Sequence, residues 1–517
     1  MRVNFGMLLA LAGIVTGCGA RSAIDFGDAP DAAVACETDS DCEGADLCLR
    51  SSCEDGTCTA PDPVLCEDED PCTVDSCEPD SGECRFEAWD VDGDGDGRLA
   101  PRPGFAPGAP DACGDDCDDE NAAVGPGFPE GCDGFDNDCN GVIDDGAEYT
   151  PAAPAPLRVS SEAAESSTRG GLAFNGTDYG LTFSSEEQLR RSFFAAIDAK
   201  GSLSRAASPI VNVNAETYAG PLLYNGTLFA TVWSDARQDG NYEIYMNRLD
   251  GQGRKLGPDV RLSDAADYSL HPALAYTEDE FLVVWDDRRP LPGGSATSIG
   301  VIGQRVGEDG VPVGPNLLLS RAEMAAEYAS IAVGSSRAGV VFTVLEGDRA
   351  LLVFRSFGPT LSDPGDFVTL PPENPQSPQI DFNVDRFIVT WSVYDAGPGP
   401  AIFGMALDEN GAALTPVREL TFGARFARSH AILPLGDRLL LIWADDHDGN
   451  YELYAKVLTP DLNEQEPRFR ITTTASVTLS PAAALGPGGD VGILFDDWQS
   501  GSRQTYFTRL ECRSGAF

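Results

Sequence analysis

Basic residues are scarce in this chain of 517 residues. Lys and Arg together number 35, against 83 Asp and Glu, which gives a formal net charge of −48. So negative a protein repels DNA, RNA and anionic lipid surfaces. The balance therefore excludes nucleic-acid binding and docking on a membrane through a basic patch. It favours a protein that holds multivalent cations or works in a cation-rich external medium.

Long apolar segments are also missing, apart from a short one near the N-terminus. Residues 7–15 (MLLALAGIV) are apolar and follow Arg2, but a helix that spans a bilayer needs about 20 such residues. A short apolar stretch behind a positive charge is typical of an export signal. The sequence therefore predicts an exported protein with no other segment that could cross a membrane.

The export signal ends in a motif that carries a resemblance. Residues 15–18 (VTGC) resemble the lipobox of bacterial lipoproteins, which implies that Cys18 is lipidated and becomes the mature N-terminus. Acyl chains anchor a protein because each buried methylene contributes about 0.8 kcal/mol. We expect residues 1–18 to be the signal peptide and residues 19–35 a flexible tether. Gly19 favours the outer membrane, at the cell surface or the periplasmic face, and a plain secretory signal is the alternative.

Common catalytic signatures are missing as well. The sequence contains no Gly-x-Ser-x-Gly, His-Glu-x-x-His or P-loop pattern, and its only three His are His271, His430 and His447. His271 and His430 open comparable predicted strands, so both could face a central channel. Isolated His residues are more often packing or surface residues than a shared base or metal site. We therefore predict no catalytic residue.

Cysteine is abundant in the N-terminal part. Once Cys18 is set aside, fourteen Cys are left: nine in residues 36–84, four in residues 113–139, and Cys512. Export and dense Cys predict disulfides. A zinc site is the weaker alternative, because the spacings are not paired Cys-x-x-Cys and the region has no His. If the four later Cys pair among themselves, one of the nine has to reach Cys512 and tie the end of the chain to the N-terminal module.

Two stretches place oxygen-bearing side chains at the spacing of calcium loops. Residues 90–97 (DVDGDGDG) carry alternate carboxylates, and residues 136–144 (DNDCNGVID) carry oxygens at positions one, three, five and nine; both have Gly at the sixth position. The twelfth position of the second stretch is Ala147, so the usual bidentate Glu is missing there. Residues 115–121 form a further acidic run between them. The predicted metal ligands are Asp90, Asp92, Asp94, Asp96, Asp116, Asp118, Asp136, Asp138, Asn140 and Asp144.

These stretches carry a second resemblance. Together with residues 129–135 (PEGCDGF), they resemble the cysteine-rich metal-binding motif of bacterial surface proteins, and residues 66–84 resemble the small Cys-rich repeats that often precede it. The resemblance implies metal binding at the cell surface. Hard oxygen ligands favour Ca²⁺ over copper or zinc. Solvated Asp-Gly turns without an ion are the alternative.

A repeat begins once the Cys-rich part ends. Short apolar runs end in an aromatic residue at intervals of 49 to 57 residues. A period near 50 with about four short strands per unit is the signature of a β-propeller blade. In one unit these strands are residues 272–276, 281–285, 299–306 and 316–320. The seven aromatics are Phe183, Trp233, Trp285, Phe342, Trp391, Trp443 and Phe495.

Seven aromatics predict seven blades. The last unit stops without an outer strand, and residues 156–160 (PLRVS) match the outer-strand pattern ahead of the first unit, so we expect them to close the ring. The fold class is then all-β: a seven-bladed propeller behind a small disulfide-rich module with calcium loops. An array of β-sandwiches is the alternative. The predicted parts are a cysteine-rich module (36–88), an acidic motif (89–148), a linker (149–156) and the propeller (157–512).

Two features of the propeller invite a catalytic interpretation. The turn at residues 239–245 (DGNYEIY) recurs at residues 448–454 and resembles the Asp-Gly-Asn turns of TolB-type propellers and, more loosely, the Asp-boxes of sialidases. Such turns are structural, and a plain hairpin is the simplest interpretation. Paired carboxylates at residues 286–287, 445–446 and 496–497 could serve as general acid and base, but turn residues at strand ends are the expected role.

The sequence thus predicts a lipid-anchored protein in which a calcium-binding stalk presents a propeller. The expected role of the propeller is recognition of a protein or a glycan. A sialidase-like glycoside hydrolase and a structural envelope component without a specific ligand are the alternatives. Neither the ligand nor the propeller face that would hold it follows from the sequence.

Overall fold

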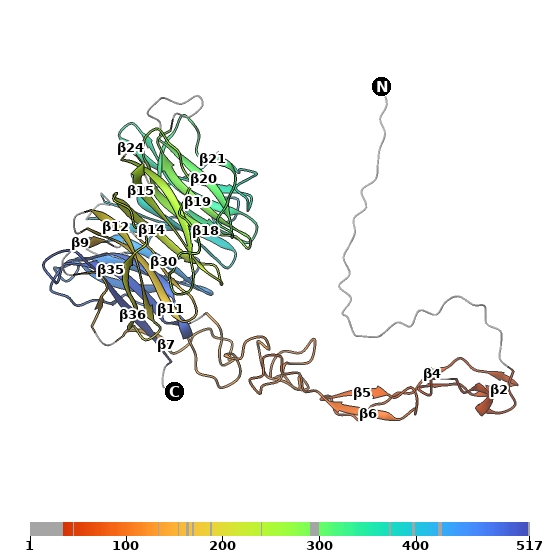
Figure 1. Cartoon of the computed structure of the whole chain (residues 1–517). Helices are drawn as coiled ribbons and strands as arrows, with labels where there is room; N and C mark the ends of the chain where they lie inside the picture. The colour runs from red at the N-terminus through yellow and green to blue at the C-terminus, as the bar shows by residue number, and fades with distance from the viewer. Residues whose placement is uncertain are drawn as a thin grey trace, which may run out of the picture. The chain divides into compact units, whose positions relative to one another are not determined.

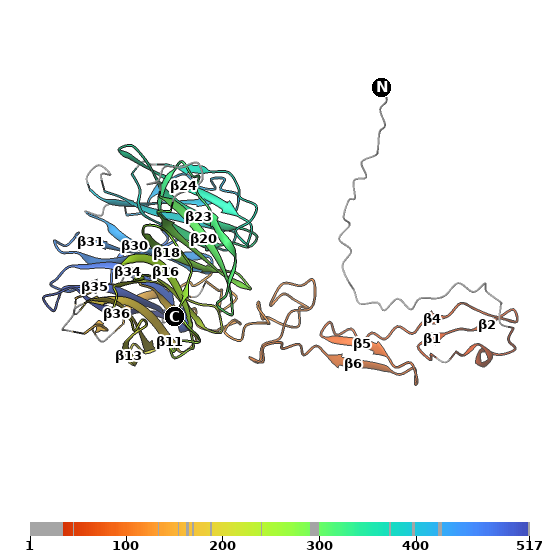
Figure 2. The ribbon, with the colours of Figure 1, turned by 45° about the horizontal axis from the view of Figure 1, so that its top comes forward.

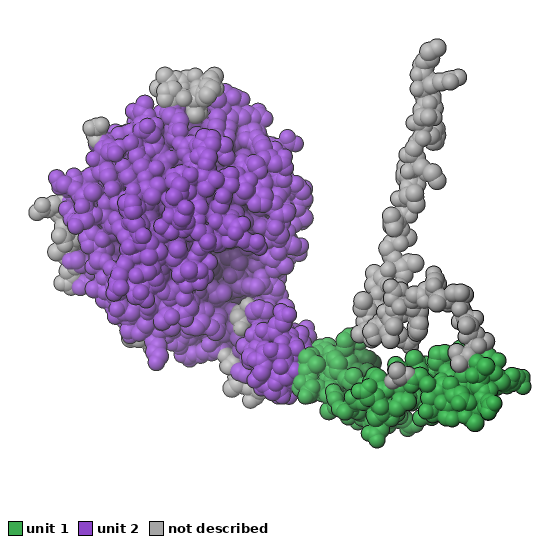
Figure 3. Space-filling model, turned by 45° about the vertical axis from the view of Figure 1, so that its right-hand side comes forward, with its two compact units in different colours: residues 1–91, 99–114 green, residues 92–98, 115–517 purple. Residues whose placement is uncertain are grey.

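The computed structural model describes residues 35–514, with gaps at 45, 133, 153–154, 162–164, 168–169, 187–188, 239, 290–298, 372–373, 395–398 and 422–425. Two compact units are coloured separately in Figure 3: residues 1–91 with 99–114, and residues 92–98 with 115–517. The predicted signal peptide, Cys18 and most of the tether lie outside the described residues. No helix in the described part is long and apolar enough to cross a membrane.

The smaller unit is stabilised by disulfides, with very few buried apolar side chains among its described residues. Cross-links that restrict the unfolded chain take the place of a core in so small a unit. Its five disulfides are Cys36–Cys53, Cys42–Cys58, Cys48–Cys77, Cys66–Cys84 and Cys72–Cys113. Its elements are η1 (Asp39–Cys42) and the strand pairs β1 (Leu49–Arg50) with β4 (Asp62–Pro63), β2 (Cys53–Glu54) with β3 (Thr57–Cys58), and β5 (Thr73–Cys77) with β6 (Cys84–Ala88).

The disulfides confirm one expectation and correct another. All fourteen Cys of the described residues are paired, as predicted. The four later Cys do not pair among themselves, because Cys113 is bonded to Cys72 in the smaller unit. Cys512 is nevertheless tied to the N-terminal part, through Cys132. The remaining pair, Cys117–Cys139, lies within the acidic motif.

The larger unit contains a seven-bladed β-propeller (Figure 1). Each blade is an antiparallel sheet, and the innermost strands contact one another in sequence, with β34 also against β10, so the ring is closed. Blade 1 contains β9 (Glu165–Ser167), β10 (Leu172–Phe174), β11 (Asp178–Glu186), β12 (Arg190–Asp198) and β13 (Leu203–Pro209); blade 2 contains β14 (Thr217–Tyr224), β15 (Phe229–Gln238), β16 (Asn241–Leu249) and β17 (Val260–Arg261). Blade 3 contains β18 (Ser269–Tyr276), β19 (Glu280–Asp287), β20 (Gly300–Gly307) and β21 (Pro312–Leu318); blade 4 contains β22 (Ala325–Val333), β23 (Ala338–Glu346), β24 (Arg349–Phe357) and β25 (Val368–Leu370); blade 5 contains β26 (Gln376–Asn383), β27 (Arg386–Val393), β28 (Ala401–Leu407) and β29 (Arg418–Glu419). Blade 6 contains β30 (Arg428–Leu435), β31 (Arg438–Asp445), β32 (Glu452–Leu458) and β33 (Phe469–Arg470), and blade 7 contains β34 (Thr478–Leu485), β35 (Val491–Asp497) and β36 (Gln504–Ser514).

The repeating aromatic lies in the second strand of every blade. All seven rings are buried between neighbouring sheets, which explains why these strands read as continuous apolar runs. In most blades the ring stacks on an aromatic partner of the third strand, as Trp233 does on Tyr245 and Trp443 on Tyr454. The predicted fold class, blade number and aromatic spacing are confirmed.

The ring is closed by strands from the N-terminal side of the propeller. In blade 7, β36 pairs with β8 (Leu157–Arg158), within the segment predicted to close the ring. It also pairs with β7 (Ala147–Pro151), so that Cys512 lies opposite Tyr149 (Figure 1). The strand pairing that closes the ring therefore begins earlier in the chain than expected, at Ala147, and it includes residues that were predicted as a linker.

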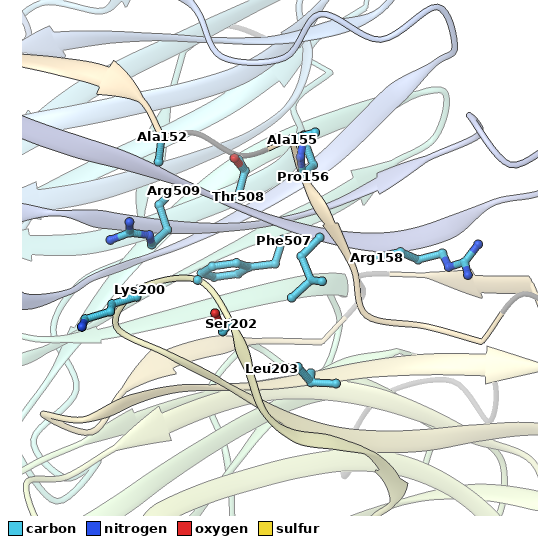
Figure 4. Close-up of a pocket in the computed structure, with 12 residues that line it drawn as sticks. Ala152, Ala155, Pro156, Arg158, Lys200, Ser202, Leu203, Phe507, Thr508 and Arg509 are labelled. Carbon is cyan, nitrogen blue, oxygen red and sulfur yellow. The ribbon is translucent and has the colours of Figure 1, made fainter.

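A cavity of about 400 Å³ lies at this seam, between the closing strands and the turn after β12 (Figure 4). Arg158, Lys200 and Arg509 line it. The Arg509 guanidinium is already engaged, since it donates to Asp490 Oδ2 at 2.9 Å and to the Ala199 carbonyl at 2.7 Å. Arg509 therefore helps to hold the seam together.

Candidate functional site

The first acidic loop folds its carboxylates inward. Asp92 accepts backbone hydrogen bonds from Gly95 (2.8 Å) and Gly97 (3.2 Å), so its carboxylate caps the turn. Carboxylate oxygens of Asp92, Asp94 and Asp96 lie within 4.8 Å of one another. Such a ring of oxygens on a tight turn is the arrangement that a hard cation requires.

Asp116 lies near this cluster, close enough for its charge to interact with those of Asp96 and Asp94. Three oxygens are buried and lack a hydrogen-bond partner among the described residues: Oδ2 of Asp94, of Asp96 and of Asp116. Asp116 is only 1% exposed. Burial raises the pKa of its carboxyl, and the negative charges of Asp96 and Asp94 raise it further. A buried carboxylate among other carboxylates is unfavourable without a compensating charge. The residues present therefore fit a bound cation.

A second cluster forms in the following loop. Oxygens of Glu130, Asp138 and Asp145 lie within 4.8 Å of one another. Glu130 is 2% exposed, and its Oε2 is buried without a hydrogen-bond partner among the described residues. Burial raises the pKa of Glu130, helped by the charges of Asp138 and Asp136, whereas the hydrogen bond from the Asp138 amide opposes the shift. This cluster fits a cation for the same reason as the first.

Three predicted ligands of this loop are not members of the second cluster and make other contacts. Asp136 accepts backbone hydrogen bonds from Asn140 (3.0 Å) and Gly141 (2.7 Å), as the first residue of a calcium loop would. Asn140 donates from its side-chain amide to Asp145 Oδ1 at 3.0 Å. Asp144 faces away from the cluster and forms a buried ion pair with Arg438, Nε to Oδ2 3.1 Å.

The remaining predicted ligands are less engaged. Asp90 is exposed and belongs to the smaller unit. Asp118 contributes its backbone amide, which donates to Asp116 Oδ1 at 2.9 Å. Sequence reasoning missed Glu130 and Asp145. Their signals were present, because Glu130 belongs to the quoted Cys-rich motif and Asp145 follows the ninth position of the loop.

The acidic motif is built into the propeller. Besides the Asp144–Arg438 pair, the hydroxyl of Tyr149 donates to the carbonyls of Cys132 and Gly489, at 3.0 Å each. Arg438 begins the second strand of blade 6, and Gly489 lies in the turn between the first and second strands of blade 7. The segment that carries the second cluster is therefore bonded to blades 6 and 7, and blade 7 is the blade in which the ring is closed.

The propeller carboxylates that could have been catalytic have structural partners. Asp287 is fully buried and accepts from Trp285 Nε1 (2.8 Å) and from Arg289. Asp235 does the same with Trp233 Nε1 (3.0 Å) and Arg237. Asp287 and the equivalent Asp235 of blade 2 are thus engaged in hydrogen-bond networks at the ends of their strands.

The two Asp-Gly-Asn turns have the same structural role; Asp239 lies outside the described residues. Glu243, fully buried at the end of the first turn, accepts from the hydroxyl of Ser263 and from Arg261 (2.9 Å). Glu452 repeats this with Thr472 and Arg470 (2.9 Å). Each turn therefore fastens its outer strand.

The two His residues expected at the channel differ in their exposure to solvent. His430 is 3% exposed and is held by Thr390 Oγ1 at 2.9 Å, and burial lowers its pKa to about 4. It is a packing residue. His271 is half-exposed, and its Nδ1 lies 2.6 Å from Asp286 Oδ2. Only His271 is available at a surface.

Residues 116–145 match a family of metal-binding sequences. Its description is "Putative metal-binding motif" (Cu-binding_MopE), and the match contains Asp116 and all three residues of the second cluster. A metal-binding motif in this part of the chain, as the resemblance implied, is thereby supported. No curated protein matches the chain.

Solved structures resemble the fold at low identity. The β-propeller domain of the Trilobed protease from Pyrococcus furiosus has a TM-score of 0.42 at 9% identity, covering 68% of this chain and 99% of that one. The N10 neuraminidase-like protein of a bat influenza A virus has 0.39 at 10%, covering 71% and 98%. Trypanosoma rangeli sialidase has 0.40 at 7%, covering 66% and 59%. At such identities the similarity concerns the fold alone.

Proposed function

We propose that this protein is an outer-membrane lipoprotein, anchored through Cys18, in which the acidic motif binds Ca²⁺ and the propeller recognises a glycan or a protein. The observation that supports metal binding most directly is the set of buried carboxylate oxygens without hydrogen-bond partners among the described residues, on Asp94, Asp96, Asp116 and Glu130. Buried charges are otherwise paired in folded proteins.

The donor set favours Ca²⁺ over softer metals. Copper and zinc prefer thiolate and imidazole ligands. All fourteen Cys of the described residues are oxidised to disulfides, and residues 36–148 contain no His. Carboxylate and amide oxygens in flexible loops suit the six to eight ligands that Ca²⁺ takes.

In this proposal the ion neutralises the two clusters and fixes the loops that carry them. Asp92 and Asp136 already orient their turns through backbone amides, so the other carboxylates are free to point at the cation. Because Asp138 and Asp145 of the second cluster lie between Cys132 and β7, fixing their loop also steadies the segment that closes the propeller.

Calorimetric titration of the mature chain with CaCl₂ tests the metal assignment. We expect binding that Asp116→Asn and Glu130→Gln each weaken, while Glu120→Gln, an exposed residue of the same motif, leaves it unchanged. Equal or tighter binding of Cu²⁺ or Zn²⁺ would contradict the choice of ion. No heat with any of the three at millimolar concentration would contradict metal binding altogether.

A further inference from the structure

One position of the repeat distinguishes part of the propeller. In blades 3 to 7 the innermost strand contains a β-bulge with a non-glycine residue at positive φ. A bulge of this kind strains the backbone and changes the direction of a side chain, and such strained positions are common at functional sites. Blades 5 to 7 have Ser at this position, whereas blades 3 and 4 have a His and a Tyr. The five residues are His271, Tyr328, Ser377, Ser429 and Ser480.

The two large residues lie together. The rings of His271 and Tyr328 have centroids 4.6 Å apart, and Tyr328 is 43% exposed. Asp286, at the end of β19, holds His271 through Nδ1, so Nε2 is the nitrogen left for a ligand. Asp286 takes the place that Ser234 and Ser392 occupy in blades 2 and 5, whereas blade 7 has Asp496 there. Because blades 5 to 7 have Ser at the bulge, the His271–Tyr328 pair is an addition to the repeat and is not required by it.

A groove with aromatic walls adjoins this pair. A cavity of about 270 Å³ between blades 2 and 3 is lined by Tyr218, Tyr242, Leu270 and His271, among others. The ring centroids of Tyr218 and Tyr242 are 5.4 Å apart, and those of Tyr242 and Tyr268 are 5.8 Å apart. The hydroxyl of Tyr242 donates to Glu216 Oε2 at 2.5 Å, which fixes the middle ring.

The groove and the pair share one face of the ring. They are formed by the starts of first and third strands and by the end of a second strand, which an antiparallel meander brings to the same side. The contacts of Asp144 and Tyr149 with the propeller are made on the other side, where the first strands end and the second strands begin. The groove is formed where β16 and β18 of neighbouring blades meet (Figure 2).

The geometry points to a binding site for a neutral oligosaccharide along this groove. A sugar ring has an apolar face that packs on tyrosine rings and hydroxyl groups that need donors and acceptors at the edge. The groove offers both, with His271, Asp286 and Glu327 beside the rings. This inference deepens the proposed function, because it rests on the propeller being a recognition domain.

The charges of the site favour a neutral sugar over an acidic one. Glu327 lies close enough to Asp286 for their charges to interact. Burial and then that interaction raise the pKa of Glu327, whereas the charges of His271 and Arg288 oppose the shift. Arg190 packs over the Tyr218 ring at 4.8 Å and pairs with Glu186 at 2.6 Å, so its charge is offset. An anionic sugar beside Asp286 and Glu327 would be repelled.

The repeat itself supplies the variants that test the site. His271→Ser and Tyr328→Ser install the residue that blades 5 to 7 carry at the same bulge, so the backbone is expected to tolerate them. Tyr451→Ala is the matched control, since Tyr451 occupies in blade 6 the turn position that Tyr242 occupies in blade 2. Circular dichroism and thermal unfolding of each variant verify that the propeller is intact.

The experiment is calorimetric titration of the mature chain, with Ca²⁺ present, with neutral hexasaccharides of β-glucan, mannan, xylan and galactan, and with sialyllactose as the anionic comparison. We expect at least one neutral hexasaccharide to bind, the His271→Ser/Tyr328→Ser double variant to weaken that binding about tenfold or more, and Tyr451→Ala to bind as the unaltered protein does. Binding of none of the neutral sugars, or a preference for sialyllactose, would overturn the inference.

Two further outcomes separate this site from the broader proposal. Binding of a neutral sugar that persists in the double variant would overturn the groove as the site, while the propeller would still be a recognition domain. Ca²⁺ binding without any sugar binding would overturn the glycan inference and leave the metal assignment in place.

Discussion

Buried carboxylates occur in both the acidic motif and the propeller, but with opposite surroundings. Asp287 in the propeller is buried against a guanidinium and an indole N–H. Asp116 and Glu130 in the motif are equally buried, yet each keeps one oxygen without a hydrogen-bond partner among the described residues. The comparison teaches that burial alone does not mark a site. What distinguishes Asp116 and Glu130 from Asp287 is a buried oxygen without a hydrogen-bond partner in the company of other carboxylates, which calls for a cation from outside the chain.

The sharpest way to test this comparison is to remove a satisfied carboxylate. Asp287→Ala leaves Arg289 and the Trp285 indole without their acceptor in the interior. We expect a loss of about 3–5 kcal/mol in the free energy of unfolding, as for other broken buried pairs, with or without Ca²⁺. Urea unfolding in EDTA and in CaCl₂ measures it; a loss confined to the Ca²⁺ sample would contradict the distinction between the two kinds of carboxylate.

The second prediction concerns the disulfide Cys132–Cys512, which links the acidic motif to the propeller. Replacing Cys132 and Cys512 together with Ser removes a cross-link between residues 380 positions apart. We expect a loss of about 2–4 kcal/mol, because the unfolded chain gains freedom, with the β7–β36 pairing still holding the ring closed. Urea unfolding of this variant beside Cys117→Ser/Cys139→Ser, which opens a loop of 22 residues, provides the comparison. An effect smaller than that of the control would contradict a role in closure.

Ca²⁺ should act on the motif carboxylates alone. At an ion concentration a hundredfold above the dissociation constant, we expect the unaltered protein to gain about 2.7 kcal/mol per site, and Glu130→Gln to lose the gain of its own site. In EDTA the same variant should be at least as stable as the unaltered protein, since it no longer buries an unpaired charge. Destabilisation in EDTA would show that the chain itself already compensates the buried charge of Glu130.

The smallest expected effect concerns pH and serves as a control on the propeller side. The pKa of His430 is lowered by burial to about 4, below its ordinary 6.5, so the unfolded chain binds a proton in the range from 6.5 down to 4 while the folded chain does not. This contribution is fully present above pH 6.5 and is lost as the pH falls toward 4. We expect His430→Gln to reduce the loss of stability between pH 7 and pH 5 by about 2 kcal/mol, whatever the Ca²⁺ concentration. Unfolding midpoints across this range test it.

Much of the fold could be predicted from the sequence because the repeat is visible in one residue type. Each blade needs one large ring between sheets, so Trp285 and its six equivalents mark the period. The closing strand followed from a missing outer strand. The pairing of Cys113 with Cys72 could not be predicted, because connectivity depends on how loops fold back and not on spacing.

The candidate site was less predictable for a physical reason. Spacing identified which loops are rich in oxygen, but not which way each carboxylate turns. Asp144 pairs with Arg438, nearly 300 residues later, and its neighbour Asp145 joins the cluster in its place. The groove and the adjoining His271–Tyr328 pair depend on strands of three blades and on a bulge that only the backbone conformation reveals.

The seam between β7 and β36 also sets the order in which this protein can mature. Residues 147–158 are synthesised early, yet their partner strand is made only after the other six blades. Until then the first blade and the growing seventh have exposed edges. The disulfide between Cys132 and Cys512 can form only after these strands have paired, and only in an oxidising compartment. It therefore cross-links the ring at a late stage, when the closing strands are already in register.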